Sequence, residues 1–167
     1  VGDEILLWDM QTGKLIRTLK KTNIDEFYNT DKNINNIISV TSATISPNGR
    51  IVASGYSDGI IKLQNAETGN NIYTLKGHDD GISTLAISPD GNTLVSTSQD
   101  NNIKIWDISQ RKLIHTLSGH LHNISSVDIS PDGKTLVSGC WDNTMKEWDI
   151  STGILLNTFC VSPQSGG

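Results

Sequence analysis

The stretch SPDGNTLVS at residues 88–96 recurs as SPDGKTLVS at residues 130–138 and, with changes, as SPNGRIVAS at residues 46–54. The copies begin at positions 46, 88 and 130, so each begins 42 residues after the one before it. A fixed period of about 20–50 residues is the signature of a repeat architecture. The sequence therefore predicts one structural unit that recurs along the chain.

The copy at residues 77–117 alternates short β-like runs with turns. ISTLAIS (82–88) alternates around Leu85 and Ile87, and NIKIWDI (102–108) places Ile103 and Ile105 on one face and Lys104 and Trp106 on the other, as in β-strands. The segments SPDG and QDNN supply residues that favour turns. Each copy therefore predicts a four-stranded antiparallel meander. Because its strands carry apolar side chains on both faces, such a sheet needs neighbours, and radial stacking of sheets provides them.

Bulk composition excludes several classes of protein. The net charge of −5, without a basic run, argues against a nucleic-acid or anionic-membrane binder, since both need clustered Lys or Arg. No apolar stretch approaches the roughly 18 residues that span a bilayer. Cys140 and Cys160 form no disulfide framework and no metal-ligand spacing, so we expect reduced thiols, a cytoplasmic location, no metal and no cofactor.

The motifs within the repeat resemble those of the WD-repeat (WD40) β-propeller family. They are GH at 77–78 and 119–120, the SPDG turns, IKIWD at 103–107 and MKEWD at 145–149. The resemblance covers nearly the whole chain outside one insertion, and the combined pattern is highly specific. It implies an all-β propeller of four-stranded antiparallel blades, commonly about seven in a closed ring. The chain is expected to hold about three and a half of them.

Spacing along the chain gives the predicted boundaries. Trp148 follows Trp106 by 42 residues, and Trp106 follows its equivalent Gln64 by 42, but Gln64 follows Trp8 by 56. The predicted segments are a half blade with two outer strands (1–19), an inserted loop (20–37), three blades (38–76, 77–118 and 119–160) and a tail (161–167). The missing Met at Val1 and the half-propeller count predict a fragment, favoured over two copies that complete a ring together.

One set of side chains looks like a Ser-His-Asp catalytic triad that occurs twice. Its members are His78, Ser96 or Ser98, and Asp100, repeated as His120, Ser138 and Asp142. A hydrolase also needs an oxyanion hole, and an active site is seldom duplicated at a repeat period. The resemblance instead implies a buried structural network that includes Trp106 and Trp148. The chain is therefore predicted not to be an enzyme.

The first full blade departs from the motif. Asp58 is retained, but Asn36 stands at the His position and Gln64-Asn65 replaces Trp-Asp. This blade is expected to lack the network. Drift in a tolerant repeat explains the change, and the alternative is that the inserted loop and a partner replace the missing interactions.

The resemblance places binding on the loops of the top face of the propeller, where variable loops sit on rigid strands. The predicted contact residues are Tyr56, Ser57, Asp79, Asp80, Gln99, Leu121, His122 and Trp141. Trp141 stands out because exposed aromatic rings are favoured at binding hot spots. The alternative is that its ring lies flat on its own blade.

Three classes of function compete. The favoured one is a non-catalytic scaffold that binds a protein or peptide, with the remaining blades or a second copy as a further partner. The alternative is a regulatory or sensor segment of a larger protein, for example one with a kinase or NTPase domain. The third, an enzyme, lacks a metal cluster and a phosphate-binding loop. The open ends are expected to make the isolated chain self-associate.

Overall fold

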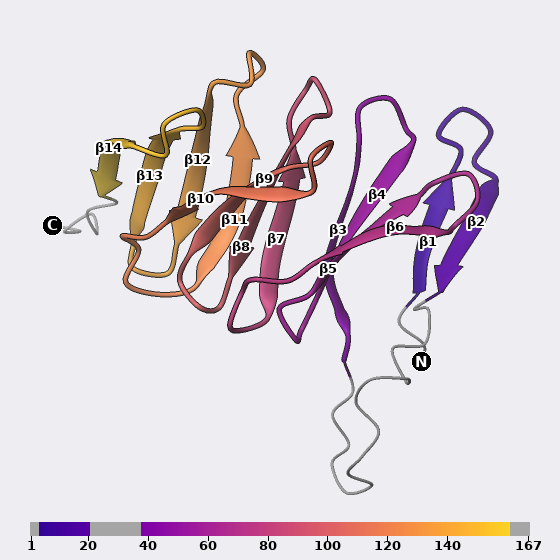
Figure 1. The fold of residues 1–167 in the computed structure, drawn as a ribbon, viewed down its shortest axis with the longest axis horizontal. Helices are drawn as coiled ribbons and strands as arrows, with labels where there is room; N and C mark the ends of the chain where they lie inside the picture. Colours follow the sequence, from indigo (N-terminus) through magenta and orange to yellow (C-terminus); the bar gives the residue numbers. More distant parts are fainter. Residues whose placement is uncertain (1–3, 21–37, 161–167) are drawn as a thin grey trace, which may run out of the picture.

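A computed structural model describes residues 4–20 and 38–160 of the chain (Figure 1). These residues form strands joined by turns and contain no helix, and hence none that is long and apolar enough to cross a membrane. The strands are β1 (Glu4–Trp8), β2 (Leu15–Lys20), β3 (Val40–Ile45), β4 (Ile51–Tyr56), β5 (Ile61–Asn65), β6 (Asn71–Leu75), β7 (Ile82–Ile87), β8 (Thr93–Ser98), β9 (Ile103–Asp107), β10 (Lys112–Leu117), β11 (Ile124–Ile129), β12 (Thr135–Cys140), β13 (Thr144–Asp149) and β14 (Leu155–Cys160).

The strands group into one two-stranded and three four-stranded sheets, each an antiparallel meander. We call them the half blade (β1–β2), the first blade (β3–β6), the second blade (β7–β10) and the third blade (β11–β14). Figure 1 shows the sheets side by side in chain order. The predicted fold class, an all-β partial propeller of about three and a half blades, is confirmed. The predicted insertion, apart from Lys20, and the predicted tail lie outside the described residues.

The recurring SPDG segment is a hairpin turn held by its own side chains. In the second blade, the Ser88 hydroxyl donates to Asp90 at 2.5 Å and accepts from the N–H of Thr93 at 2.9 Å. Gly91 closes the turn with a φ of 77°, a left-handed conformation that suits glycine. Because this chemistry is local, the motif produces the same turn wherever it recurs.

Adjacent blades bury apolar side chains between their faces. We call the side of a blade that faces the next blade in the chain its forward face. Val95, Ile103 and Ile105 on the forward face of the second blade are 0% exposed and form one core with Leu136 and Trp148 of the third blade. Full burial of such a side chain contributes about 1.5–3 kcal/mol, so contact between blades is a major source of stability.

The forward face of the third blade is not covered by any described residue. Val137, Met145 and Phe159 stand one repeat after buried residues of the second blade, and they expose 41, 43 and 47% of their surface. Val137, Met145 and Phe159 lie on successive strands β12, β13 and β14. The described part of the chain therefore ends in an open sheet face with an apolar component.

Candidate functional site

The second blade contains a buried network of four side chains. His78 precedes β7, Ser96 lies on β8, Asp100 follows β8, and Trp106 lies on β9. Nδ1 of His78 lies 2.8 Å from the Asp100 carboxylate, and its Nε2 lies 2.8 Å from Ser96 Oγ. The indole N–H of Trp106 donates to the same Ser96 oxygen at 2.8 Å. Ser96 therefore joins the histidine to the tryptophan.

The hydrogen bonds fix the protons of this network. The Asp100 carboxylate accepts the Nδ1 proton of His78, and Trp106 already donates to Ser96 Oγ, so the Ser96 hydroxyl donates to Nε2. Burial lowers the pKa of His78 and outweighs the Asp100 carboxylate, which raises it. The net shift favours the neutral ring. Burial raises the pKa of Asp100, but hydrogen bonds from His78 and from backbone N–H groups outweigh it, so the net pKa is lowered.

The third blade repeats the network. His120 Nδ1 lies 3.2 Å from the Asp142 carboxylate, His120 Nε2 lies 2.7 Å from Ser138 Oγ, and Trp148 donates to Ser138 at 3.0 Å. Burial again lowers the pKa of the histidine. Ser96 and Ser138 are 0% exposed, so neither hydroxyl is positioned to attack a substrate. The triad-like set thus has the geometry of an internal brace.

Ser98, the other serine considered for the network, has a different role. Its hydroxyl donates to the carbonyl of Asp80 at 2.8 Å and accepts from the N–H of Asp100 at 3.1 Å, so it ties together the two loops at this edge of the blade. In the third blade Cys140 takes its place, with Sγ 3.0 Å from the carbonyl of His122. Burial raises the pKa of the Cys140 thiol.

Cys140 places a third potential metal-ligand atom beside His120 and Asp142. The spacing in the sequence did not predict this cluster. The donor atoms of His120, Cys140 and Asp142 lie within 4.8 Å of one another. His120 and Asp142 already bind each other, and the thiol makes the contact that Ser98 makes one repeat earlier. Hydrogen bonding therefore accounts for the whole cluster without a metal ion.

The prediction that Tyr56 is an exposed contact residue is wrong. Tyr56 is 2% exposed, and its hydroxyl lies 3.4 Å from Oγ of Ser54, the equivalent of Ser96. The Lys62 ammonium lies 5.4 Å from the centre of the Tyr56 ring, a cation–π arrangement. In the blade that has Gln64 instead of a tryptophan, Tyr56 fills space beside the network serine.

Asp58 is separate from any such network among the described residues. Its side chain is exposed and accepts a hydrogen bond from the N–H of Ile60 at 3.2 Å. Asn36, which stands at the histidine position of this blade, lies outside the described residues. Asp58 thus shapes the turn between β4 and β5.

The other predicted contact residues are exposed at one edge of the blades. We call this the top edge, formed by residues 57–60, 76–81, 99–102, 118–123 and 141–143. Leu121 is 77% exposed and Trp141 is 71% exposed. The remaining exposed members of the set are Ser57, Asp79, Asp80, Gln99 and His122. The ring of Trp141 is thus available to solvent rather than covered by its own blade.

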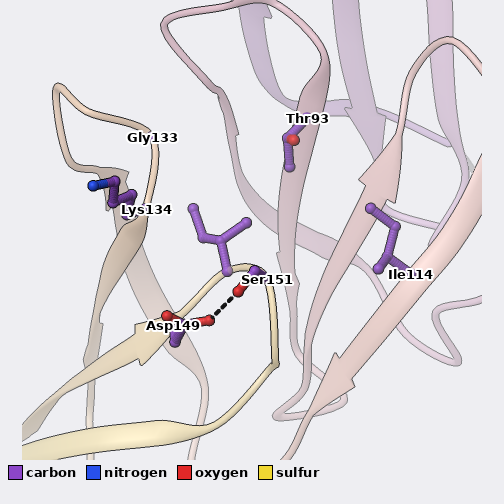
Figure 2. A pocket seen from close by; sticks show the side chains of 7 residues that line it. Thr93, Ile114, Gly133, Lys134, Asp149 and Ser151 are labelled. Carbon is purple, nitrogen blue, oxygen red and sulfur yellow. Dashed lines mark hydrogen bonds between the residues drawn. The ribbon is translucent and has the colours of Figure 1, made fainter.

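A cleft of about 550 Å³ lies between the second and third blades, at the edge opposite the top edge (Figure 2). It is lined by Thr93 and Ile114 of the second blade and by Lys134, Asp149 and Ser151 of the third. The Asp149 carboxylate accepts from the Ser151 hydroxyl at 2.7 Å, and this bond helps to lower the pKa of Asp149. Asp149 is therefore engaged in its own hairpin turn.

Comparison with protein families agrees with this geometry. The model described as WD domain, G-beta repeat matches residues 69–107 and 111–149. The model described as Anaphase-promoting complex subunit 4 WD40 domain matches residues 3–86, or 84 of the 167 residues. No curated protein shows a significant match to the chain.

Proposed function

Because the chain belongs to the WD-repeat family, whose members generally act as protein-interaction scaffolds, we propose that it binds a protein or peptide through its top edge. The observation that carries this proposal is the pair of large exposed side chains Leu121 and Trp141. They lie in the two loops that form the top edge of the third blade. Single exposed apolar residues are common, but two held together on one edge form a contact surface.

Hydrogen bonds hold these two loops in a fixed relation. The N–H of Leu121 donates to the Asp142 carboxylate at 3.0 Å, and the N–H of Trp141 donates to the carbonyl of Asn123 at 3.1 Å. Asp142 is also anchored through His120 to the core of the blade. A rigid base reduces the entropy lost when a partner orders the surface. The top edge of the third blade is therefore suited to binding.

The repeated His-Ser-Asp sets support a non-catalytic role. Their serine hydroxyls are buried and bonded to indole N–H groups. We further propose a cytoplasmic location, because Cys140 and Cys160 are both free thiols and Cys160 is exposed. Reduced thiols of this kind persist in a reducing compartment.

We also propose that a further blade or a second copy of the chain covers the forward face of the third blade. The register supports this, because Val137 pairs with Asp128 on β11 and with Glu147 on β13, so all three side chains share that face. One repeat earlier, Ile105 stands at the position of Glu147 and is 0% exposed. Residues of this face thus stand at positions that are buried in the second blade, but two of them, Asp128 and Glu147, carry carboxylates.

The scaffold proposal is tested by affinity capture with the whole chain. Combined Leu121→Ala and Trp141→Ala substitutions should abolish capture of a partner, whereas Thr152→Ala, in a hairpin at the opposite edge, should not. Because the two substituted side chains are largely exposed, their truncation opens no cavity. Loss of capture only with Thr152→Ala would move the site to the opposite edge.

A further inference from the structure

The top edges of the second and third blades have the same backbone framework. The N–H of Asp79 donates to the Asp100 carboxylate at 3.1 Å, as that of Leu121 donates to Asp142 at 3.0 Å. The N–H of Gln99 donates to the carbonyl of Gly81 at 2.9 Å, and Trp141 makes the equivalent bond at 3.1 Å. The two blades therefore hold equivalent side chains in equivalent places.

On this shared framework the two blades present opposite chemistry. The second blade presents Asp79, Asp80 and Gln99, and the third presents Leu121, His122 and Trp141 at the equivalent positions, 42 residues later. All six side chains are exposed. Since the blades are neighbours, an acidic patch lies beside an apolar, aromatic patch along one edge.

The acidic patch is not neutralised by the described part of the chain. No lysine or arginine of that part forms an ion pair with Asp79 or Asp80. Lys76 is the one lysine among residues 57–60, 76–81, 99–102, 118–123 and 141–143, and these segments contain no arginine. Asp58 adds a further exposed carboxylate on the first blade. The potential along this edge therefore favours a cationic partner.

We infer that the partner is a polypeptide segment with two neighbouring features, a lysine or arginine that faces Asp79 and Asp80, and an apolar or aromatic side chain that packs on Leu121 and Trp141. This inference rests on the proposed function and names the chemistry of its partner. The apolar contact supplies most of the affinity, because a desolvated aromatic anchor dominates binding energy. The charge pair sets orientation and the rate of association, because exposed ion pairs add little affinity.

The test is selection of peptides from a phage-displayed random library on the immobilised whole chain. Peptides enriched on the natural chain should combine Lys or Arg with a large apolar residue. On a chain with Asp79→Asn and Asp80→Asn, the basic residue should no longer be enriched while the apolar one still is. Glu67→Gln, at an exposed carboxylate in a hairpin at the opposite edge, is the matched control and should leave the selected sequences unchanged.

Synthetic peptides from the selection should then bind the Asp79→Asn, Asp80→Asn chain about tenfold more weakly at low salt, the sum of two exposed charge pairs. The difference should vanish at about 0.5 M salt, because screening removes interactions between exposed charges. Enrichment of peptides without a basic bias, abolished by Trp141→Ala, would overturn this inference and leave the scaffold function standing. If Trp141→Ala leaves the enrichment unchanged, or if no peptide is enriched at all, both this inference and the scaffold function are wrong.

Discussion

Replacement of Ser96 by alanine should reveal how much the buried network contributes to stability, and Ser54→Ala supplies a matched control in the same chain. Both serines are 0% exposed and occupy the same position one repeat apart. Ser96 Oγ binds His78 and Trp106, each at 2.8 Å. Among the residues that the structure describes, Ser54 Oγ has only long contacts, 3.4 Å to the hydroxyl of Tyr56 and 3.5 Å to a backbone carbonyl.

The expected magnitude follows from the groups left without a partner. Ser96→Ala leaves the Nε2 atom of His78 and the N–H of Trp106 unpaired, although both side chains are more than nine-tenths buried. An unsatisfied buried group costs about 1–3 kcal/mol, and the lower half of that range for two groups that share one oxygen gives about 2–4 kcal/mol. Contacts as long as those of Ser54 contribute little, so Ser54→Ala should cost less than about 1 kcal/mol.

The free energy of unfolding of each variant can be measured by urea denaturation followed by circular dichroism. Ser138→Ala, in the third blade, should behave like Ser96→Ala because it also loses bonds to a histidine and a tryptophan. Equal losses of stability in Ser54→Ala and Ser96→Ala would refute the reasoning, since the network would then contribute nothing beyond the burial of a serine.

Three other predictions follow from the same contacts. Asp100→Ala should lower the free energy of unfolding by about 2–4 kcal/mol in urea denaturation, and Asp58→Ala, which breaks a turn contact with Ile60, by clearly less. Burial lowers the pKa of His78, so the neutral ring contributes its full stabilisation above about pH 6.5, and this stabilisation is lost as the pH falls toward the lower pKa of the folded state. The free energy of unfolding should therefore decline between about pH 7 and 5, and less steeply in His78→Gln. Combined Asp128→Ala and Glu147→Ile, which restore the apolar residues of the preceding blade, should increase self-association in sedimentation velocity, and an unchanged profile would contradict the role of the open face.

The strands and turns were predictable because their determinants are local. Ser88, Asp90 and Gly91 close their hairpin with hydrogen bonds and a left-handed glycine within a few residues of one another. Alternation of apolar side chains then set which residues face a neighbouring blade. A 42-residue period added the order of the sheets, since each unit has to cover the next.

The burial of Tyr56 was not predictable in the same way. Its position places it at the end of β4, next to turn residues that are exposed in the other blades. The equivalent residue of the second blade, Ser98, is also buried, and the Lys62 ammonium on the adjacent strand lies 5.4 Å from the centre of the Tyr56 ring. The turn motif and the repeat spacing report neither contact. The choice between Ser96 and Ser98 likewise depended on which residue faces the ring of His78, which their spacing left open.

Repeats within one chain also separate residues that the fold needs from residues that are free to vary. The network has the same four residue types in the second and third blades, whereas the exposed residues Asp79, Asp80 and Gln99 of the second blade are replaced by Leu121, His122 and Trp141 in the third. Backbone atoms and buried carboxylates make the bonds that hold those loops. The exposed side chains are therefore not needed to form these loops. Any constraint on which residues stand there has to come from contact with a binding partner.

An exchange of residues between blades tests this separation directly. Leu121→Asp, His122→Asp and Trp141→Gln give the third blade the exposed residues of the second while its backbone hydrogen bonds remain. Stability should change by no more than about 0.5 kcal/mol per site in urea denaturation, since the substituted side chains are exposed. Peptides selected on the natural chain should lose their binding, because both members of the apolar patch are gone. If the exchanged chain loses several kcal/mol of stability, Leu121 and Trp141 support the blade itself; if it keeps its peptides, the surface they form is not the binding site.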